Sequence, residues 1–153
     1  MPAYTTRKRI LIVDDDPDVL EVHAALLEAA GYEVARAEHS LAALFEIIRK
    51  APDLILADLR MPIMDGLALV RELKARPETR HIQVVALTGY DTPESRAASQ
   101  EAGCAGYLTK PIDARHFAEE VARFLQPPDS LPAIFKPLSR QGFAAGPGAP
   151  AQR

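Results

Sequence analysis

The segment ILIVDDDPDVLE, residues 10–21, changes within a few positions from an apolar run to the start of a helix. Four apolar residues, Ile10 to Val13, are followed by three aspartates and by Pro17. Asp16 stands where a side-chain oxygen caps a helix, and Pro17 occupies the first helical position, where its missing N–H is no loss. A strand that leads directly into a capped helix is the repeating unit of α/β proteins.

Apolar runs of this kind recur along the chain and alternate with segments of helical spacing. Further runs lie at residues 54–57, 84–87 and 106–109, with a weaker one at 33–37. The helical spacing is carried by Val19, Val22, Leu26 and Ala30; by Leu41, Leu44, Phe45 and Ile48; by Leu67, Leu69, Val70 and Leu73; by residues 93–102; and by Phe117, Val121, Phe124 and Leu125. Because the strand runs are apolar throughout, we predict an α/β, doubly wound fold: a five-stranded parallel sheet with helices on both faces.

Length and charge exclude several classes of protein. The 153 residues have room for one domain of ordinary size and a short extension. The formal net charge of −3 lacks the basic excess that binding to a phosphate backbone usually requires, so we expect no direct nucleic-acid partner. The longest apolar runs, such as residues 41–45, are far shorter than the roughly 20 residues that cross a bilayer, so we expect no membrane span.

The basic residues 7–9 and the single cysteine bear on location. The apolar run after residues 7–9 leads at once into aspartates, which is unlike an export signal. Cys104 cannot form an internal disulfide, and its small neighbours predict a structural role. We therefore predict a cytoplasmic protein. The four histidines lack the spacing of metal ligands and are assigned no site: His23, His39, His81 and His116.

Polar side chains follow four of the predicted strands. Asp14 and Asp15 come after the first strand, Asp58 after the third, Thr88 after the fourth and Lys110 after the fifth. In an open parallel sheet ligands bind beyond the carboxyl ends of the strands, so these groups should meet there. Clustered carboxylates repel one another and recruit a hard cation such as Mg²⁺, which commonly bridges carboxylates to a phosphoryl group. Asp58 is the natural nucleophile of such a site, with Lys110 and Thr88 placed to contact phosphoryl oxygens.

Taken in order, four stretches resemble the receiver domain of two-component response regulators. They are ILIVDDDPDVLE at 10–21, LILADLRMPIMDGLALV at 54–70, VVALTGYDTPES at 84–95 and GYLTKPI at 106–112. The resemblance runs from about residue 9 to residue 125, within a receiver domain that we place at residues 7–126. It implies a flavodoxin-like sheet with the strand order 2-1-3-4-5.

The resemblance also implies a role for each residue at the acidic end of the sheet. Asp14, Asp15, Asp58 and the backbone carbonyl of Arg60 would hold Mg²⁺, and Asp58 would accept the phosphoryl group. Asp65, before a glycine, is instead interpreted as a cap or turn residue.

A second set of residues would respond to phosphorylation. Thr88 would bind a phosphoryl oxygen, Lys110 would pair with the phosphate charge, and Tyr107 would be the switch aromatic that turns inward with Thr88. The resemblance also implies a cis peptide before Pro111. Gly89 departs from the alanine that is commoner there, and we expect it to leave room for the phosphoryl group.

From the resemblance we expect a phosphorylation-activated switch rather than a turnover enzyme. Its partners would be a sensor histidine kinase or a histidine phosphotransfer protein, and downstream a protein that binds the face of the fourth helix, fifth strand and fifth helix. The sequence has no helix-turn-helix pattern, so we expect no DNA-binding output domain and no direct contact with nucleic acid.

Residues 127–153 differ from the rest of the chain. They hold six of the 13 prolines, which predicts an extended or disordered tail rich in proline, alanine and glycine. Leu131, Ile134, Phe135 and Leu138 have helical spacing that prolines interrupt. A solvated spacer is favoured there, and docking onto a partner or onto the domain is the alternative. Met1 and this ending favour a small complete protein over a fragment of a hybrid kinase.

Two other functions remain open. Asp14-x-Asp16 resembles the nucleophile motif of haloacid dehalogenase phosphatases, which would make Asp14 the nucleophile. That motif needs threonine or valine where Asp18 stands, and it leaves Asp58 without a role. A scaffold receiver that is no longer phosphorylated would have lost an acid, the threonine or the lysine, and all are present.

Overall fold

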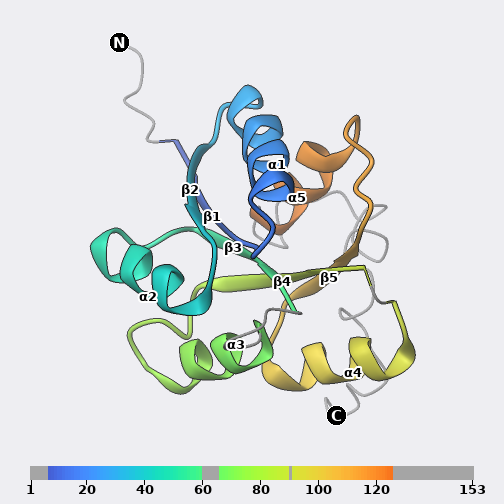
Figure 1. Ribbon diagram of the computed structural model, residues 1–153. Coiled ribbons are helices and arrows are strands. Elements are labelled where there is room, and N and C mark those ends of the chain that lie inside the picture. The colour runs from blue at the N-terminus through green and yellow to red at the C-terminus, as the bar shows by residue number, and fades with distance from the viewer. Residues whose placement is uncertain (1–6, 60–65, 90, 126–153) are drawn as a thin grey trace.

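Five parallel strands form one sheet in the order β2-β1-β3-β4-β5, as predicted (Figure 1). The computed structural model describes residues 7–59, 66–89 and 91–125. The strands are β1 (Arg9–Val13), β2 (Glu33–Ala37), β3 (Leu54–Asp58), β4 (Gln83–Thr88) and β5 (Gly106–Thr109). The helices are α1 (Pro17–Ala29), α2 (Ser40–Arg49), α3 (Gly66–Ala75), α4 (Pro93–Ala102) and α5 (Phe117–Leu125). The chain order reverses beside β1, so β1 and β3 flank the position where ligands bind in such sheets.

The strands separate two apolar cores, one on each face of the sheet. In β1, Ile10 and Ile12 belong to one core, and Leu11 and Val13 belong to the other, because successive strand residues point to opposite faces. Helices α1 and α5 cover the first face, and α2, α3 and α4 cover the second (Figure 1). Both faces of the central strands are therefore dry, which explains why these strands are apolar throughout.

The helix ends follow from local chemistry. The Asp16 side chain accepts hydrogen bonds from the backbone N–H of Asp18 at 3.0 Å and of Val19 at 3.4 Å, and Pro17 begins α1. Gly103 ends α4 with φ of 116°, a left-handed conformation that glycine adopts without a Cβ clash. The cap predicted for Asp16 is confirmed.

The apolar faces predicted for the first two helices are wrong in detail. In α1 the buried residues include Leu20 and Leu27, whereas Val22 is 58% exposed. In α2 the buried residues are two small ones, Ser40 and Ala43, and one large one, Ile47. The spacing correctly predicts a helix in each case, but the face that packs is chosen by the position of the helix over the sheet.

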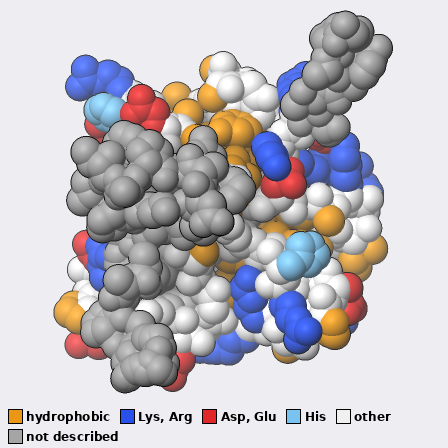
Figure 2. All heavy atoms as spheres, turned by 180° about the vertical axis from the view of Figure 1, so that it is seen from behind, with side chains coloured by type: hydrophobic (Ala, Val, Ile, Leu, Met, Phe, Trp, Pro, Cys, Tyr) orange, Lys and Arg blue, Asp and Glu red, His pale blue; other side chains and the backbone are white. Residues whose placement is uncertain are grey.

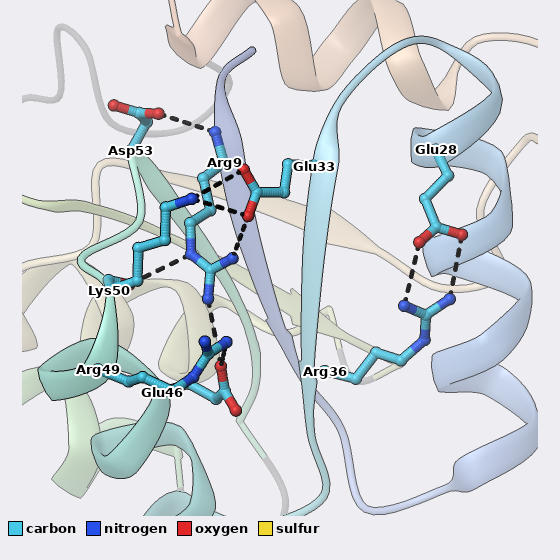
Figure 3. Close-up of polar contacts among 8 residues, drawn as sticks. All are labelled: Arg9, Glu28, Glu33, Arg36, Glu46, Arg49, Lys50 and Asp53. Carbon is cyan, nitrogen blue, oxygen red and sulfur yellow. Dashed lines mark hydrogen bonds and ion pairs between the residues drawn. The ribbon is translucent and has the colours of Figure 1, made fainter. Parts of the chain in front are cut away.

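A buried arginine joins the amino ends of the first three strands (Figure 3). The side chain of Arg9 contacts Glu33 (Nη1 to Oε2, 2.6 Å) and Glu46 (Nη2 to Oε1, 3.2 Å) and donates from Nε to the Lys50 carbonyl. Its backbone N–H donates to Asp53 Oδ2 at 2.8 Å. The side chain of Arg9 thereby links β1, β2 and the end of α2, and its backbone adds the segment entering β3.

The described surface carries charges of both signs. On the face shown in Figure 2, basic and acidic side chains are interspersed among apolar ones. No helix in the described ranges is long and apolar enough to cross a membrane. Cys104 is buried, and burial raises the pKa of its thiol to about 12, in keeping with a structural role. The predicted tail, residues 127–153, lies outside the described residues.

Candidate functional site

Three carboxylates meet at the carboxyl end of the sheet. Asp14 follows β1 and Asp58 ends β3, and the pairing of Val13 with Ala57 brings these two strand ends side by side. Both aspartates are buried, whereas Asp15 is exposed. One oxygen from each of the three carboxylates lies within 4.8 Å of the others. The structure thus brings together the three aspartates that the sequence placed in one site.

Lys110 lies among these carboxylates. Its Nζ donates to Asp14 Oδ2 at 2.7 Å and lies 3.5 Å from Asp58 Oδ2. Burial lowers the pKa of Lys110, but the hydrogen bond to Asp14 and the charges of Asp14 and Asp58 outweigh it, so the pKa is raised. The ammonium is therefore charged at neutral pH, and the three carboxylates exceed it by two negative charges.

Asp14 is held at both oxygens. Its Oδ2 accepts from Lys110, and its Oδ1 accepts from the backbone N–H of Asp16 at 3.0 Å. Asp16 itself uses Oδ1 to cap α1. The two acids of the Asp14-x-Asp16 motif therefore have different surroundings: one lies in the cluster and the other serves the helix.

The donor set fits a hard divalent cation. All three side chains offer carboxylate oxygen, the ligand that Mg²⁺ prefers, and excess negative charge in a partly dry site favours a cation. Arg60, whose carbonyl was predicted as a further ligand, lies outside the described residues, as does Asp65.

Thr88 and Tyr107 lie on the neighbouring strands. Thr88 ends β4 and is fully buried, and Tyr107 in β5 is 2% exposed. The Tyr107 hydroxyl donates to Ser95 Oγ at 2.9 Å, and the guanidinium of Arg96 lies 4.6 Å from the centre of its ring. Tyr107 therefore packs inward against α4, with contacts from Ser95 and Arg96 that the sequence alone did not suggest.

Two glycines near Asp58 differ in what a side chain would meet. A Cβ added to Gly66 would lie 2.3 Å from the backbone oxygen of Asp58, so α3 begins directly against the strand end that carries this carboxylate. Within the described residues, a Cβ added to Gly89 would meet no atom within 4 Å, so there is open space at this position. Gly66, by contrast, is a close-contact position beside Asp58 that sequence reasoning missed.

A groove runs beside Lys110, between α1 and the segment after β5. It is lined by Val19, His23, Lys110, Pro111 and Ile112. His23 is buried against the ring of Phe117, with ring centroids 5.2 Å apart, and within the described part of the chain its Nδ1 has no hydrogen-bond partner. Burial, and secondarily the charge of Lys110, lower the pKa of His23.

Two further predictions near the groove have a clear outcome. The Lys110-Pro111 peptide bond is cis, as the resemblance implied. His23, to which the sequence assigned no site, is buried and lines the groove beside Lys110. No metal-ligand spacing marks it, so only its place on α1 could have indicated this.

Comparison with known proteins gives consistent relatives. The family model of the response regulator receiver domain matches residues 10–122. The polar-differentiation response regulator DivK of Brucella anthropi is 35% identical over 118 residues, which are 77% of this chain and 96% of DivK. The response regulator PleD of Caulobacter vibrioides is 45% identical over 105 residues, 69% of this chain but 23% of PleD.

Solved structures agree with this family. A response regulator of Chloroflexus aurantiacus has a TM-score of 0.74 at 33% identity, over 78% of this chain and 98% of that protein. The chemotaxis protein CheY4 of Vibrio cholerae has a TM-score of 0.74 at 26% identity, over 77% of this chain and 98% of CheY4. The receiver domain of a Syntrophus aciditrophicus histidine kinase has a TM-score of 0.71 at 37% identity, over 77% of this chain and 89% of that domain.

Proposed function

This chain belongs to the response regulator receiver domain family, and from that premise we propose that Asp58 accepts a phosphoryl group from a phosphohistidine. The observation that carries the proposal is the arrangement of Lys110 between Asp14 and Asp58, at 2.7 and 3.5 Å, in a cluster that still has excess negative charge. Receiver domains of this family interact with kinases or phosphotransfer proteins, so the donor histidine belongs to another protein.

In the proposed transfer, an oxygen of Asp58 attacks the phosphorus of the donor. The bond from phosphorus to the donor's imidazole nitrogen breaks as the bond to Asp58 forms. The other ring nitrogen of the donor carries a proton taken from water, so the imidazole leaves as a neutral base. Lys110 remains charged and sits 3.5 Å from Asp58, so it can move onto a phosphoryl oxygen with little displacement. Asp14, held at both oxygens, keeps its orientation during that movement.

Asp14, Asp15 and Asp58 would hold the ion that the family uses, with the Arg60 carbonyl as a further ligand. When bound, Mg²⁺ would supply charge that offsets the negative phosphoryl oxygens in the transition state. Within the chain, Asp15 is best suited to recruit the ion because it is the exposed member of the three.

Phosphorylation is proposed to act through Thr88 and Tyr107. The hydroxyl of Thr88 would bind a phosphoryl oxygen, which draws the end of β4 toward Asp58. Tyr107 already packs against Ser95 and Arg96 of α4, so a shift of this strand end would change the face made by α4, β5 and α5. We propose that a downstream protein binds this face, and that residues 7–126 form the whole receiver.

The alternatives are weighed by the same residues. A phosphatase with Asp14 as nucleophile would leave Asp58 without a role, and Asp16, the second acid of that motif, caps α1 with its side chain. A non-phosphorylated scaffold keeps the same fold and is separated from a working receiver only by experiment. The proposed role is that of a switch, not of a turnover enzyme, in the cytoplasm.

The test is intact-mass spectrometry after incubation with a small phosphodonor such as acetyl phosphate, with and without Mg²⁺. The proteins are the wild type, Asp58→Asn and Asp14→Asn. We expect one phosphoryl group on the wild type, dependent on Mg²⁺, none on Asp58→Asn, and a slower gain on Asp14→Asn. No gain on the wild type favours the scaffold, and a gain that survives Asp58→Asn but is lost in Asp14→Asn favours the phosphatase.

A further inference from the structure

Helix α2 has large apolar side chains on the side that faces away from the sheet. Its buried residues are Ser40, Ala43 and Ile47, of which two are small. Leu41, Phe45 and Ile48 are respectively 60%, 68% and 81% exposed. A helix that only covered a sheet would place its large apolar residues inward and polar ones outward. In α2, by contrast, three large apolar side chains point outward, while two of the three buried residues are small.

The exposed residues form one continuous stripe. Leu41, Phe45 and Ile48 are spaced by four and three positions, so they lie on the same face of the helix. They are three of the four large hydrophobic residues that are exposed within the described ranges; the other is Val22 on α1. Contiguous apolar patches on a protein surface, unlike scattered single residues, mark interaction sites. We call Leu41, Phe45 and Ile48 the α2 stripe.

The proposed phosphoryl chemistry does not use the α2 stripe. The acidic cluster is built from the ends of β1, β3 and β5, and the proposed output face comprises α4, β5 and α5. Helix α2 lies beside β2, at the opposite side of the sheet from β5 (Figure 1). The stripe therefore requires an explanation of its own.

The charges around the stripe change sign along the helix. Glu38 precedes the helix and is exposed, whereas Arg49 and Lys50 stand at its other end with side chains 63% and 55% exposed. These two cations also pair within their own chain, with Glu46 and Glu33 respectively, but both remain open to solvent. A second α2 that runs antiparallel places the acidic end of one helix against the basic end of the other. A parallel arrangement would instead place like charges together. The pattern of charge is therefore complementary to itself.

We propose that the α2 stripe packs against the α2 stripe of a second copy of this chain, with the two helices antiparallel about a two-fold axis. In this arrangement Leu41 of one copy faces Ile48 of the other, and the two Phe45 side chains lie next to the axis. Glu38 of one copy approaches Arg49 and Lys50 of the other at both rims. Such an isologous contact is the commonest way in which identical chains associate.

The occupant is a second copy rather than another protein because both elements of the pattern match under the same two-fold operation. The ends of the stripe, Leu41 and Ile48, are centred between positions 44 and 45, next to Phe45, and rotation about that centre exchanges these ends. The same rotation brings position 38 to within about two residues of 49 and 50. Binding to an unrelated helix would not require either the apolar stripe or the charges of α2 to match themselves under this rotation.

Sedimentation velocity of the full chain over a series of concentrations tests the contact. We expect a reversible dimer in the wild type and a dissociation constant at least about thirtyfold weaker in Phe45→Glu, the loss typical of a residue at the centre of an interface. Val22→Glu is the matched control, since Val22 is 58% exposed but lies on α1; it should dimerise like the wild type. Circular dichroism confirms that both variants fold.

Charge reversal tests the orientation of the helices. Glu38→Arg and Arg49→Glu should each weaken the dimer, and the double variant should restore it, because the rim pairs are then re-formed with opposite signs. Arg49 also contacts Glu46 of its own chain at 2.8 Å, so the restoration, and not the single loss, is the informative result. Failure of the double variant to recover would overturn the antiparallel arrangement.

Cross-linking gives an independent readout of register. When Leu41→Cys and Ile48→Cys variants are mixed under oxidation, a disulfide dimer of one of each should form faster than either homodimer. Cys104 contributes little background because it is buried, with a thiol pKa of about 12. A chain that is monomeric at all concentrations, or a dimer that Phe45→Glu leaves intact, overturns the proposal. Asp58→Asn should dimerise normally, which separates this result from that of the phosphorylation test.

Discussion

Charged side chains gather around a buried charge at both ends of the sheet, Arg9 at the amino end and Asp14 and Asp58 at the carboxyl end, but the two ends differ in charge balance. At the amino end the basic groups equal the acidic ones: Arg9, Arg49 and Lys50 face Glu33, Glu46 and Asp53 (Figure 3). At the carboxyl end the three clustered carboxylates of Asp14, Asp15 and Asp58 have one ammonium beside them, that of Lys110, which contacts Asp14 and Asp58. Both sets lie where strands meet loops. Only the second has an excess of negative charge that a cation could neutralise.

The balanced charges at the amino end fit a role in stabilising the fold, whereas the unbalanced charges at the carboxyl end fit a role in binding a ligand. A buried ion pair stabilises little beyond a hydrophobic replacement, but removing one member leaves a charge without compensation and costs several kcal/mol. Loss of Arg9, the buried member at the amino end, should therefore destabilise the fold. The carboxyl end already contains uncompensated negative charge, so repulsion among its carboxylates destabilises the folded chain before any mutation. Binding of a cation, or removal of one carboxylate charge, would relieve that repulsion.

Replacing Arg9 by methionine should have the largest effect on stability. Arg9→Met leaves Glu33 and Glu46 beside an apolar chain, and we expect the free energy of unfolding to fall by about 3 kcal/mol. Urea unfolding followed by circular dichroism measures this. Arg36→Met is the control, because Arg36 pairs with Glu21 and Glu28 on the surface and should cost under about 1 kcal/mol. An equal fall in the free energy of unfolding in the two variants would show that the contacts of Arg9 stabilise the fold no more than a surface ion pair does.

Gly66→Ala should disturb the carboxyl end through the backbone. The added Cβ would lie 2.3 Å from the Asp58 carbonyl oxygen, so the strand end or the start of α3 must move, at a cost of about 2 kcal/mol. We also expect slower phosphorylation by the small donor. Gly89→Ala, where a Cβ meets none of the described atoms within 4 Å, should change the free energy of unfolding by under about 0.5 kcal/mol. A normal phosphorylation rate in Gly66→Ala would show that the placement of Asp58 tolerates this shift.

Magnesium should stabilise the carboxyl end and leave the amino end unaffected. An ion that binds only the folded chain raises the free energy of unfolding by about 1 to 3 kcal/mol at concentrations well above its dissociation constant. Thermal unfolding with Mg²⁺ and with EDTA measures the difference. Asp15→Asn should reduce the gain without unfolding the chain, because Asp15 is exposed. The Arg9→Met variant should keep the full magnesium gain, and its loss there would contradict the independence of the two ends.

The smallest expected effect is a change in stability with pH near His23. Burial and Lys110 lower the pKa of His23 in the folded chain, while the unfolded chain keeps a value near 6.5. As pH falls below that value the unfolded chain takes up a proton first, so stability falls with decreasing pH. Unfolding free energies from pH 7.5 to pH 5 should show this fall, and His23→Leu should flatten it.

His116 provides the control of opposite sign. Its hydrogen bond to Asp113 raises the pKa of His116, so its contribution is complete below pH 6.5 and is lost as pH rises. His116 and Asp113 are exposed, so the effect is small. His116→Gln should therefore leave the acid-side loss of stability in place or increase it. If His116→Gln flattened the dependence of the unfolding free energy on pH, the attribution of the fall to His23 would be wrong.

Much of the fold could be predicted because its signals are local. Each strand is a short apolar run, and the Asp16-Pro17 start of α1 is specified by neighbouring atoms. The acidic cluster was also predictable, because parallel strands bring their carboxyl ends to one side of the sheet. What failed was the choice of helix face. Leu41 and Phe45 have the periodicity of a core yet are exposed, since periodicity does not say which of two apolar faces meets the sheet.

By itself the sequence determined the alternation of strands and helices and which residue types stand at each strand end, because both depend on near neighbours. Only the tertiary structure decided the distances among Asp14, Asp58 and Lys110, the burial of His23, the contact of Gly66 with the Asp58 backbone and the exposure of the α2 stripe. Each of these depends on how elements distant in sequence are placed against one another. Packing and charge summed over the whole chain, rather than any local pattern, set that placement.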